Sequence, residues 1–202
     1  MSALTAIYIV NGVACLSAPL SGCLSDSLVG RYWAVVLGMV LYILGYILLT
    51  VLASNGLALI GCNWKTADQA LNWDIISHPC YVQVTIMLVL IGAGVGCVRA
   101  NIPPFLAEQV RAGSRDAICQ FFNAYYWCAN LGAAVGVGVL SYVEQNFEDG
   151  FYTAFLTATL CLCASLAVFC AGRCYYVIHQ PRIFVLSNIV GILCKLTSFI
   201  FI

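Results

Sequence analysis

Charged side chains are what this sequence has least of. Eight Lys and Arg and eight Asp and Glu make up 8% of its 202 residues, whereas 63% are hydrophobic. A soluble domain of average composition has about 25% charged residues. A chain of this length would need a polar surface to fold in water, and the residues for one are missing. The composition excludes a soluble domain and indicates an integral membrane protein.

Residue combinations typical of catalysis are missing too. The two histidines, His78 and His179, fall near opposite faces of the expected membrane region, and neither is accompanied by a nucleophile or by a metal-ligand pattern. We therefore expect no enzyme, no metal site and no resident cofactor, and no nucleic-acid partner.

Cysteine, in contrast, is abundant, with twelve residues that fall mostly inside apolar stretches. Cys163, Cys170 and Cys174 fit one helical face, but no fourth ligand accompanies them. Packing as small apolar side chains is the favoured role. Cys62 and Cys80 flank a long connection, and a disulfide between them stays open in an oxidising lumen.

Five apolar stretches are long enough for a transmembrane helix, which takes about 20 residues. They cover residues 3–22, 33–54, 82–98 with an extension beyond, 117–143 and 150–172. A sixth stretch, 183–202, contains Asn188 and Lys195, and both a span and an interfacial helix stay open for it. We predict an all-α membrane protein with a bundle over 1–175 and a cytoplasmic or interfacial tail over 176–202.

Basic residues favour one side of the membrane. If all five stretches span, the connections on one side hold five arginines, which are Arg31, Arg111, Arg115, Arg173 and Arg182. The opposite connections hold one basic residue, Lys65. The arginine side is therefore predicted to be cytoplasmic. The chain then starts outside or in a lumen, so we expect one more helix upstream. A signal peptide is the alternative for the first stretch, but no Lys or Arg precedes its apolar run.

Polar residues gather inside the fourth stretch, "FFNAYYWCANLGAAVGVG". Asn123, Tyr126 and Asn130 are spaced by three and four residues, so they share one helical face. Gly132 and Gly136, like Gly92 and Gly96 in the third stretch, form a GxxxG pattern that lets helices approach closely. Taken alone, the asparagines are best explained as hydrogen bonds between helices.

Arg99 changes that interpretation, because it follows seventeen residues without a formal charge. A charge inside a span needs a partner or a water-filled cavity. The alternative is a side chain that reaches the cytoplasmic interface from a helix end, especially if Pro103 and Pro104 break the helix. The continuing apolar sequence favours a cavity-facing Arg99.

Three motifs resemble those of one family. "PLSGCLSDSLVGRY" resembles the loop between helices two and three of major facilitator transporters. "GVGCVRANIPPFLAEQV" and "FFNAYYWCANLGA" narrow the resemblance to the proton-coupled oligopeptide transporter (PTR2) family, and "ANI" is similar to its peptide/histidine transporter branch. The resemblance implies an incomplete N-terminal major facilitator bundle of about five helices, without the family's first helix and C-terminal half.

The resemblance also implies roles for single residues. It assigns Asp26 and Arg31 to a cytoplasmic gating pair, with Gly22 and Gly30 permitting tight backbone geometry. It places Arg99 where the family generally has a cavity lysine. It makes Asn130, with Tyr126 and Asn123 on the same face, part of the substrate site. Arg99 can hold a carboxylate but does not readily release a proton, and the family's ExxER motif is absent.

The expected function is proton-coupled transport of di- or tripeptides or of histidine. Its partners are the lipid bilayer and the small substrate, and its location is the plasma membrane or an endolysosomal membrane. The alternative is a truncated, non-transporting membrane protein that associates with other membrane helices through its small-residue faces.

Overall fold

Five long helices form the described part of the protein. The computed structural model describes residues 3–54, 78–110, 115–147 and 149–178. The helices are α1 (Ala3–Leu24), α2 (Arg31–Ala53), α4 (His78–Val110), α5 (Arg115–Asn146) and α6 (Gly150–Ala171). Each is long and apolar enough to cross a membrane, which confirms the five predicted spans. The sixth stretch, 183–202, and the connection with Cys62 lie outside the described residues.

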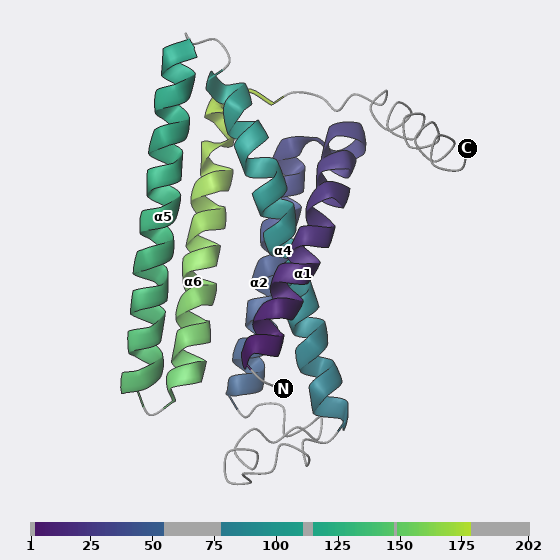
Figure 1. Ribbon diagram of the computed structural model, residues 1–202, viewed down its shortest axis with the longest axis vertical. Coiled ribbons are helices and arrows are strands. Elements are labelled where there is room, and N and C mark those ends of the chain that lie inside the picture. Colours follow the sequence, from purple (N-terminus) through teal and green to yellow (C-terminus); the bar gives the residue numbers. More distant parts are fainter. Residues whose placement is uncertain (1–2, 55–77, 111–114, 148, 179–202) are drawn as a thin grey trace, which may run out of the picture.

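The helices alternate in direction along one common axis (Figure 1). The turn from α1 to α2, the start of α5 and the end of α6 all lie at one end of the bundle. Arg31 opens α2 and Arg173 follows α6, so these two arginines share that end. This arrangement agrees with the predicted topology, and we call this end, which the arginines predict to face the cytoplasm, the cytoplasmic end.

Glycines let α4 pack closely against two neighbours. A Cβ on Gly92 would meet Val10 and Val13 of α1, and a Cβ on Gly96 would meet Ser17 and the main chain of α1. Gly94 lies against the main chain of α2 in the same way. The prediction of close approach at Gly92 and Gly96 is confirmed.

The other small-residue pattern lies on an open surface. A Cβ on Gly132 or Gly136 would meet nothing within 4 Å, and none of the described side chains of α5 is buried. The prediction of close approach at these two glycines is therefore not met within the described residues. Instead, α5 packs beside α6, and α6 reaches α2 through the pair Thr50 and Thr159, whose hydroxyls lie 3.4 Å apart.

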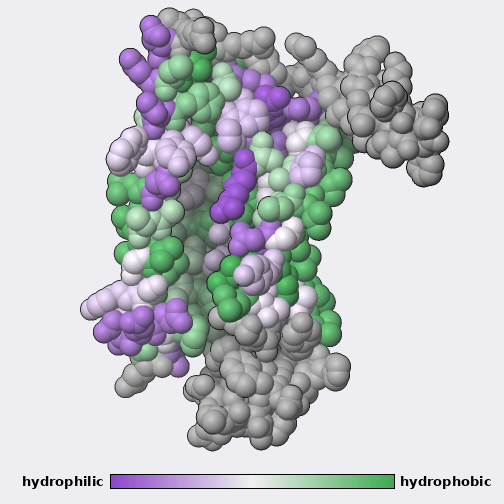
Figure 2. All heavy atoms as spheres, in the orientation of Figure 1, coloured by the Kyte–Doolittle hydropathy of each residue, from purple (hydrophilic) through white to green (hydrophobic). Residues whose placement is uncertain are grey.

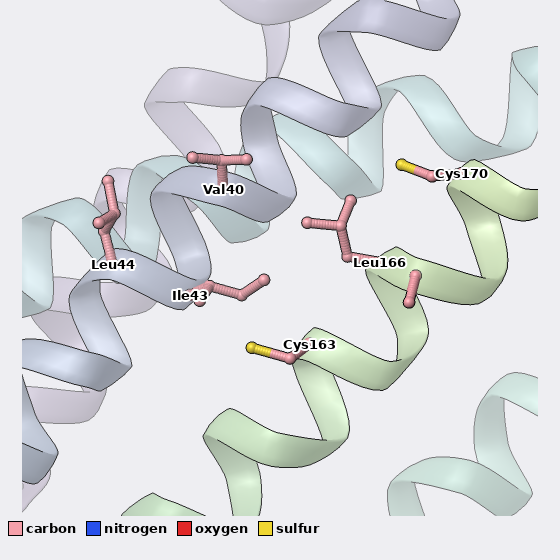
Figure 3. A pocket seen from close by; sticks show the side chains of 7 residues that line it. Val40, Ile43, Leu44, Cys163, Leu166 and Cys170 are labelled. Atoms are coloured by element: carbon pink, nitrogen blue, oxygen red, sulfur yellow. The ribbon is translucent and has the colours of Figure 1, made fainter.

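An apolar cavity of about 320 Å³ lies between α2 and α6 (Figure 3). Its lining comes from both helices and consists of Val40, Ile43, Leu44, Cys163, Leu166, Ala167 and Cys170. Cys163 and Cys170 therefore lie among hydrocarbon side chains, as expected for cysteines that act as small apolar residues.

Candidate functional site

A tight turn at the cytoplasmic end joins α1 to α2. The last residues of α1 continue into a short π-helix, Ser25–Val29, and Gly30 then adopts φ 82° and ψ 147°. This conformation is open to glycine and unfavourable for residues with a Cβ. The Gly30 N–H donates to the carbonyl of Ser25 over 2.8 Å. As a result, the chain reverses between Asp26 and Arg31 and brings their side chains together.

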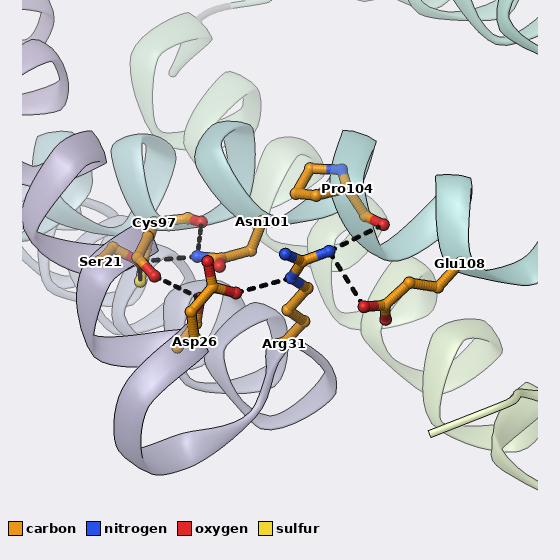
Figure 4. A network of polar contacts seen from close by, with 9 residues as sticks. Ser21, Asp26, Arg31, Cys97, Asn101, Pro104 and Glu108 are labelled. Atoms are coloured by element: carbon orange, nitrogen blue, oxygen red, sulfur yellow. Dashed lines mark hydrogen bonds and ion pairs between the residues drawn. The ribbon is translucent and has the colours of Figure 1, made fainter. Parts of the chain in front are cut away.

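Arg31 lies at the centre of a polar network (Figure 4). Its Nε donates to Oδ1 of Asp26 over 2.8 Å, and its Nη1 donates to Oε1 of Glu108 over 3.0 Å. Nη1 also donates to the carbonyl of Pro104 over 3.3 Å. The side chains of Arg31, Asp26 and Glu108 are 28%, 36% and 18% exposed, so water screens the Glu108 pair less than a surface pair. The network ties the turn to the cytoplasmic end of α4.

The structure changes two sequence expectations about this turn. Gly22 lies in α1, and a Cβ there would meet nothing within 4 Å, so the expectation of tight geometry at Gly22 is wrong. Glu108 was not predicted as the second partner of Arg31. The available signal was an acidic residue at the cytoplasmic end of the third stretch, on the predicted side of Arg31.

A second polar network is buried between α1, α2 and α4. Asn101 is 1% exposed, and its Nδ2 donates to Ser21 Oγ over 2.7 Å and to the Cys97 carbonyl over 2.8 Å. Ser21 Oγ and Cys97 Sγ are 2.7 Å apart, and Cys97 Sγ donates to the Ala34 carbonyl. Sequence reasoning missed Asn101, although an amide in an apolar span needs such partners. These bonds fix the position of α4 against α1.

Aromatic side chains close the bundle beside the Arg31 network. Tyr32 stacks on Phe169 with ring centroids 5.3 Å apart, and Phe105 meets the edge of Tyr176 at 5.3 Å. The guanidinium of Arg173 lies 5.7 Å from the centre of the Tyr32 ring, within range of a cation–π contact. These contacts hold the cytoplasmic ends of α2, α4 and α6 together.

Arg99 lies deep in α4, on the side away from these networks. The helix continues through Pro103 and Pro104 to Val110, so the break at the prolines that the alternative interpretation allowed does not occur. Arg99 is eleven residues from the helix end, about 16 Å at 1.5 Å per residue. This distance exceeds the length of an arginine side chain, so the Arg99 guanidinium does not reach the end of α4.

The direction of the Arg99 side chain follows from the helical repeat. Residues two positions apart point about 200° from each other, so Arg99 faces away from Cys97 and from the buried Asn101. It is exposed. Figure 2 shows strongly hydrophilic side chains at mid-height over α4, beside a hollow between α4 and α5. An exposed guanidinium on α4 can bind an anionic group that approaches it.

The three predicted cavity residues of α5 are exposed as well. Asn123, Tyr126 and Asn130 all lie on α5, and Tyr126 is 68% exposed. Asn130 Nδ2 donates to the Tyr126 carbonyl over 2.7 Å, which leaves its carbonyl oxygen for another donor. Within the described residues, no hydrogen bond or ion pair joins these side chains to Arg99.

Comparisons with known proteins show which family this chain belongs to. The model of the POT family (PTR2) matches residues 32–201. Solute carrier family 15 member 3 of Rattus norvegicus is 33% identical over 147 residues, which cover 68% of this chain and 25% of that protein. Protein NRT1/ PTR FAMILY 8.1 of Arabidopsis thaliana is 27% identical over 175 residues, 83% of this chain and 29% of that protein. The chain thus spans about a quarter of the length of these relatives. Because the family model covers most of the chain, this protein belongs to the POT family of integral membrane transporters.

Proposed function

We propose that this chain serves proton-coupled transport of di- or tripeptides, or of histidine, across the plasma membrane or an endolysosomal membrane. The observation that carries the proposal is the exposed Arg99 deep in α4 of a POT family chain. The guanidinium would hold the substrate carboxylate, since arginine matches a carboxylate with two parallel hydrogen bonds. Asn130, Tyr126 and Asn123 of α5 would line the same cavity. The coupling proton binds elsewhere, because arginine stays charged.

We expect uptake to follow the proton gradient. Vesicles that carry the protein should accumulate labelled L-alanyl-L-alanine when the outside is more acidic, and a protonophore should stop the accumulation. Labelled histidine, offered in the same vesicles, tells the two substrate classes apart. Uptake of neither compound under a gradient would contradict the proposal.

The Arg31 network supports a gating role at the cytoplasmic end. Arg31 bonds the turn through Asp26 and α4 through Glu108 and Pro104. Transport by alternating access needs such contacts to form in one state and break in another. Asp26, Arg31 and Gly30 would thus latch this end, and Glu108 joins them as the partner on α4.

Replacing Glu108 by Gln should loosen this latch. The variant loses the ion pair with Arg31 and keeps the Asp26 and Pro104 contacts. A half-buried charged hydrogen bond contributes about 1.5 kcal/mol, so the amides of 25–31 should exchange about ten-fold faster. Hydrogen exchange with mass spectrometry measures this change. Asp116→Asn, at an exposed acid of α5 outside the network, is the matched control. Equal exchange in the Glu108 variant and the native chain would argue against the latch.

A second candidate function rests on the open face of α5. Among the described residues, nothing covers Gly132 and Gly136 there, and small residues of this spacing let another helix approach. On this alternative the chain associates with membrane helices and does not transport. Association that depends on Gly132 and Gly136, together with no substrate binding, would favour it.

A further inference from the structure

We call the apolar cavity between α2 and α6 the α2–α6 groove, because it is open along one side. Val40 and Leu44 of α2 line it and are 37% and 47% exposed. On α6 it runs from Cys163 to Cys170 (Figure 3), about 10 Å at 1.5 Å per residue. Both helices are long and apolar enough to span a membrane, so the groove opens toward the hydrocarbon of the bilayer.

A cation and an indole ring lie at the cytoplasmic end of the same two helices. Arg173 follows α6, three residues after Cys170. Its guanidinium lies 5.2 Å from the centre of the Trp33 ring, at the start of α2. Val40 and Leu44 follow Trp33 by seven and eleven residues, so the three share one face of α2, with Val40 about 10 Å deeper than Trp33. Arg173 and Trp33 therefore lie at the cytoplasmic mouth of the groove.

The charge at this mouth is not neutralised within the described part of the chain. The two ion pairs there are both made by Arg31, and Arg173 is exposed. Anionic phospholipids of the cytoplasmic leaflet attract basic residues near the membrane surface. Trp33 is 49% exposed, and tryptophan is enriched at the depth of the lipid headgroups. An anionic headgroup is thus the complement of this mouth.

The size and lining of the groove favour an acyl chain over another helix. A helix is about 10 Å across with its side chains, so a piece as long as the groove would fill about 800 Å³. The cavity measures about 320 Å³, less than half of that volume. Its lining consists of hydrocarbon side chains and the two cysteines, which a flexible hydrocarbon chain can contact without leaving polar groups unpaired.

We propose that the α2–α6 groove and Arg173 form a binding site for an anionic phospholipid of the cytoplasmic leaflet. The lipid phosphate accepts hydrogen bonds from the Arg173 guanidinium beside Trp33, and one acyl chain lies in the groove. A zwitterionic lipid has the same phosphate but carries a cation next to it, which weakens the attraction. The site therefore selects a headgroup with net negative charge. Arg99 does not line the groove, so this assignment is independent of the proposed transport.

Two photoreactive lipids test the site in the intact chain. Phosphatidylglycerol and phosphatidylcholine, with the same diazirine-bearing acyl chain, are each added as a minor component to phosphatidylcholine nanodiscs that hold the protein. Mass spectrometry then locates the labelled peptides. Phosphatidylglycerol should label segments 40–44 and 163–170 about five-fold more than phosphatidylcholine does, because one basic residue near the surface contributes ~1 kcal/mol.

Three variants test the headgroup contact. Arg173→Gln should lower labelling by phosphatidylglycerol to the level of phosphatidylcholine. Arg173→Lys keeps the charge and should retain the native preference within about two-fold. Arg99→Gln removes an exposed arginine outside the groove and should leave the preference intact. A native preference in Arg173→Gln would refute the assignment of the headgroup to Arg173.

A matched pair of cysteine variants tests the groove. Cys163→Phe places a ring in it and should reduce labelling of 40–44 by phosphatidylglycerol. Cys161→Phe makes the same change at an exposed cysteine of α6 outside the lining and should not. Two results in the native protein would overturn the proposal. Equal labelling by both lipids would mean that the groove only faces the bilayer, and unlabelled groove segments would mean that another part of the protein fills it.

Discussion

Arg99→Gln should weaken the binding of a labelled dipeptide about 100-fold, which corresponds to ~2.7 kcal/mol. Glutamine keeps a polar end on a shorter side chain and removes the charge and the paired N–H groups that match a carboxylate. Hydrogen bonds to charged groups contribute about 1.5–3 kcal/mol each. Equilibrium binding of L-alanyl-L-alanine to the protein in nanodiscs measures the loss, and uptake into vesicles should fall with it.

Two variants define what the Arg99 result means. Arg99→Lys keeps the charge and should retain binding within about ten-fold, because lysine supplies a point charge without the paired geometry. Arg173→Gln removes an arginine of the aromatic cluster at the cytoplasmic end, and dipeptide binding should not change. Native binding by Arg99→Gln would instead assign Arg99 to the membrane interface.

The sequence predicts the features of the fold that depend on a local pattern of residues. Each span is a long apolar run, and run length with composition is sufficient to identify a transmembrane helix. The proximity of Asp26 and Arg31 follows from a five-residue separation across a turn that ends in glycine. The persistence of α4 was harder to predict, because prolines usually end a helix in water. In a bundle, neighbouring groups can satisfy the freed main chain, so the helix continues.

The local sequence pattern did not predict contacts between residues that are far apart in the chain. Glu108 is 77 residues from Arg31, and Asn101 is 80 residues from Ser21. Whether these residues meet depends on the position of α4 along α1 and α2. Side-chain packing sets that position. The GxxxG pattern shows the same limit. It occurs at Gly92 and Gly96, which meet α1, and at Gly132 and Gly136, which meet nothing within 4 Å. The pattern indicates that two helices can approach closely. The packing of the bundle determines where they do.

Gly96→Leu should destabilise the bundle more than any other single change considered for this chain. A side chain at this position meets Ser17 Oγ and the Ala14 carbonyl of α1. The carbonyl belongs to a helix and cannot turn aside, so α1 must move away from α4. Overpacking costs about 1–3 kcal/mol where side chains can adjust, and we expect at least ~3 kcal/mol here. For a chain of this size, the Tm should fall by about 6–12 °C, as measured by circular dichroism in nanodiscs.

The other GxxxG pattern supplies the control for that experiment. Gly136→Leu makes the same substitution inside α5, where a Cβ meets open space, and the Tm should stay within about 2 °C of the native value. Displacement of α1 in Gly96→Leu should also separate Ser21 from Asn101, since Ser17 and Ser21 lie on one face of α1. The amides around Asn101 should then exchange faster in Gly96→Leu and at the native rate in Gly136→Leu. Equal losses of Tm in the two variants would mean that leucine disturbs any glycine of the bundle, and that α4 is not held specifically against α1.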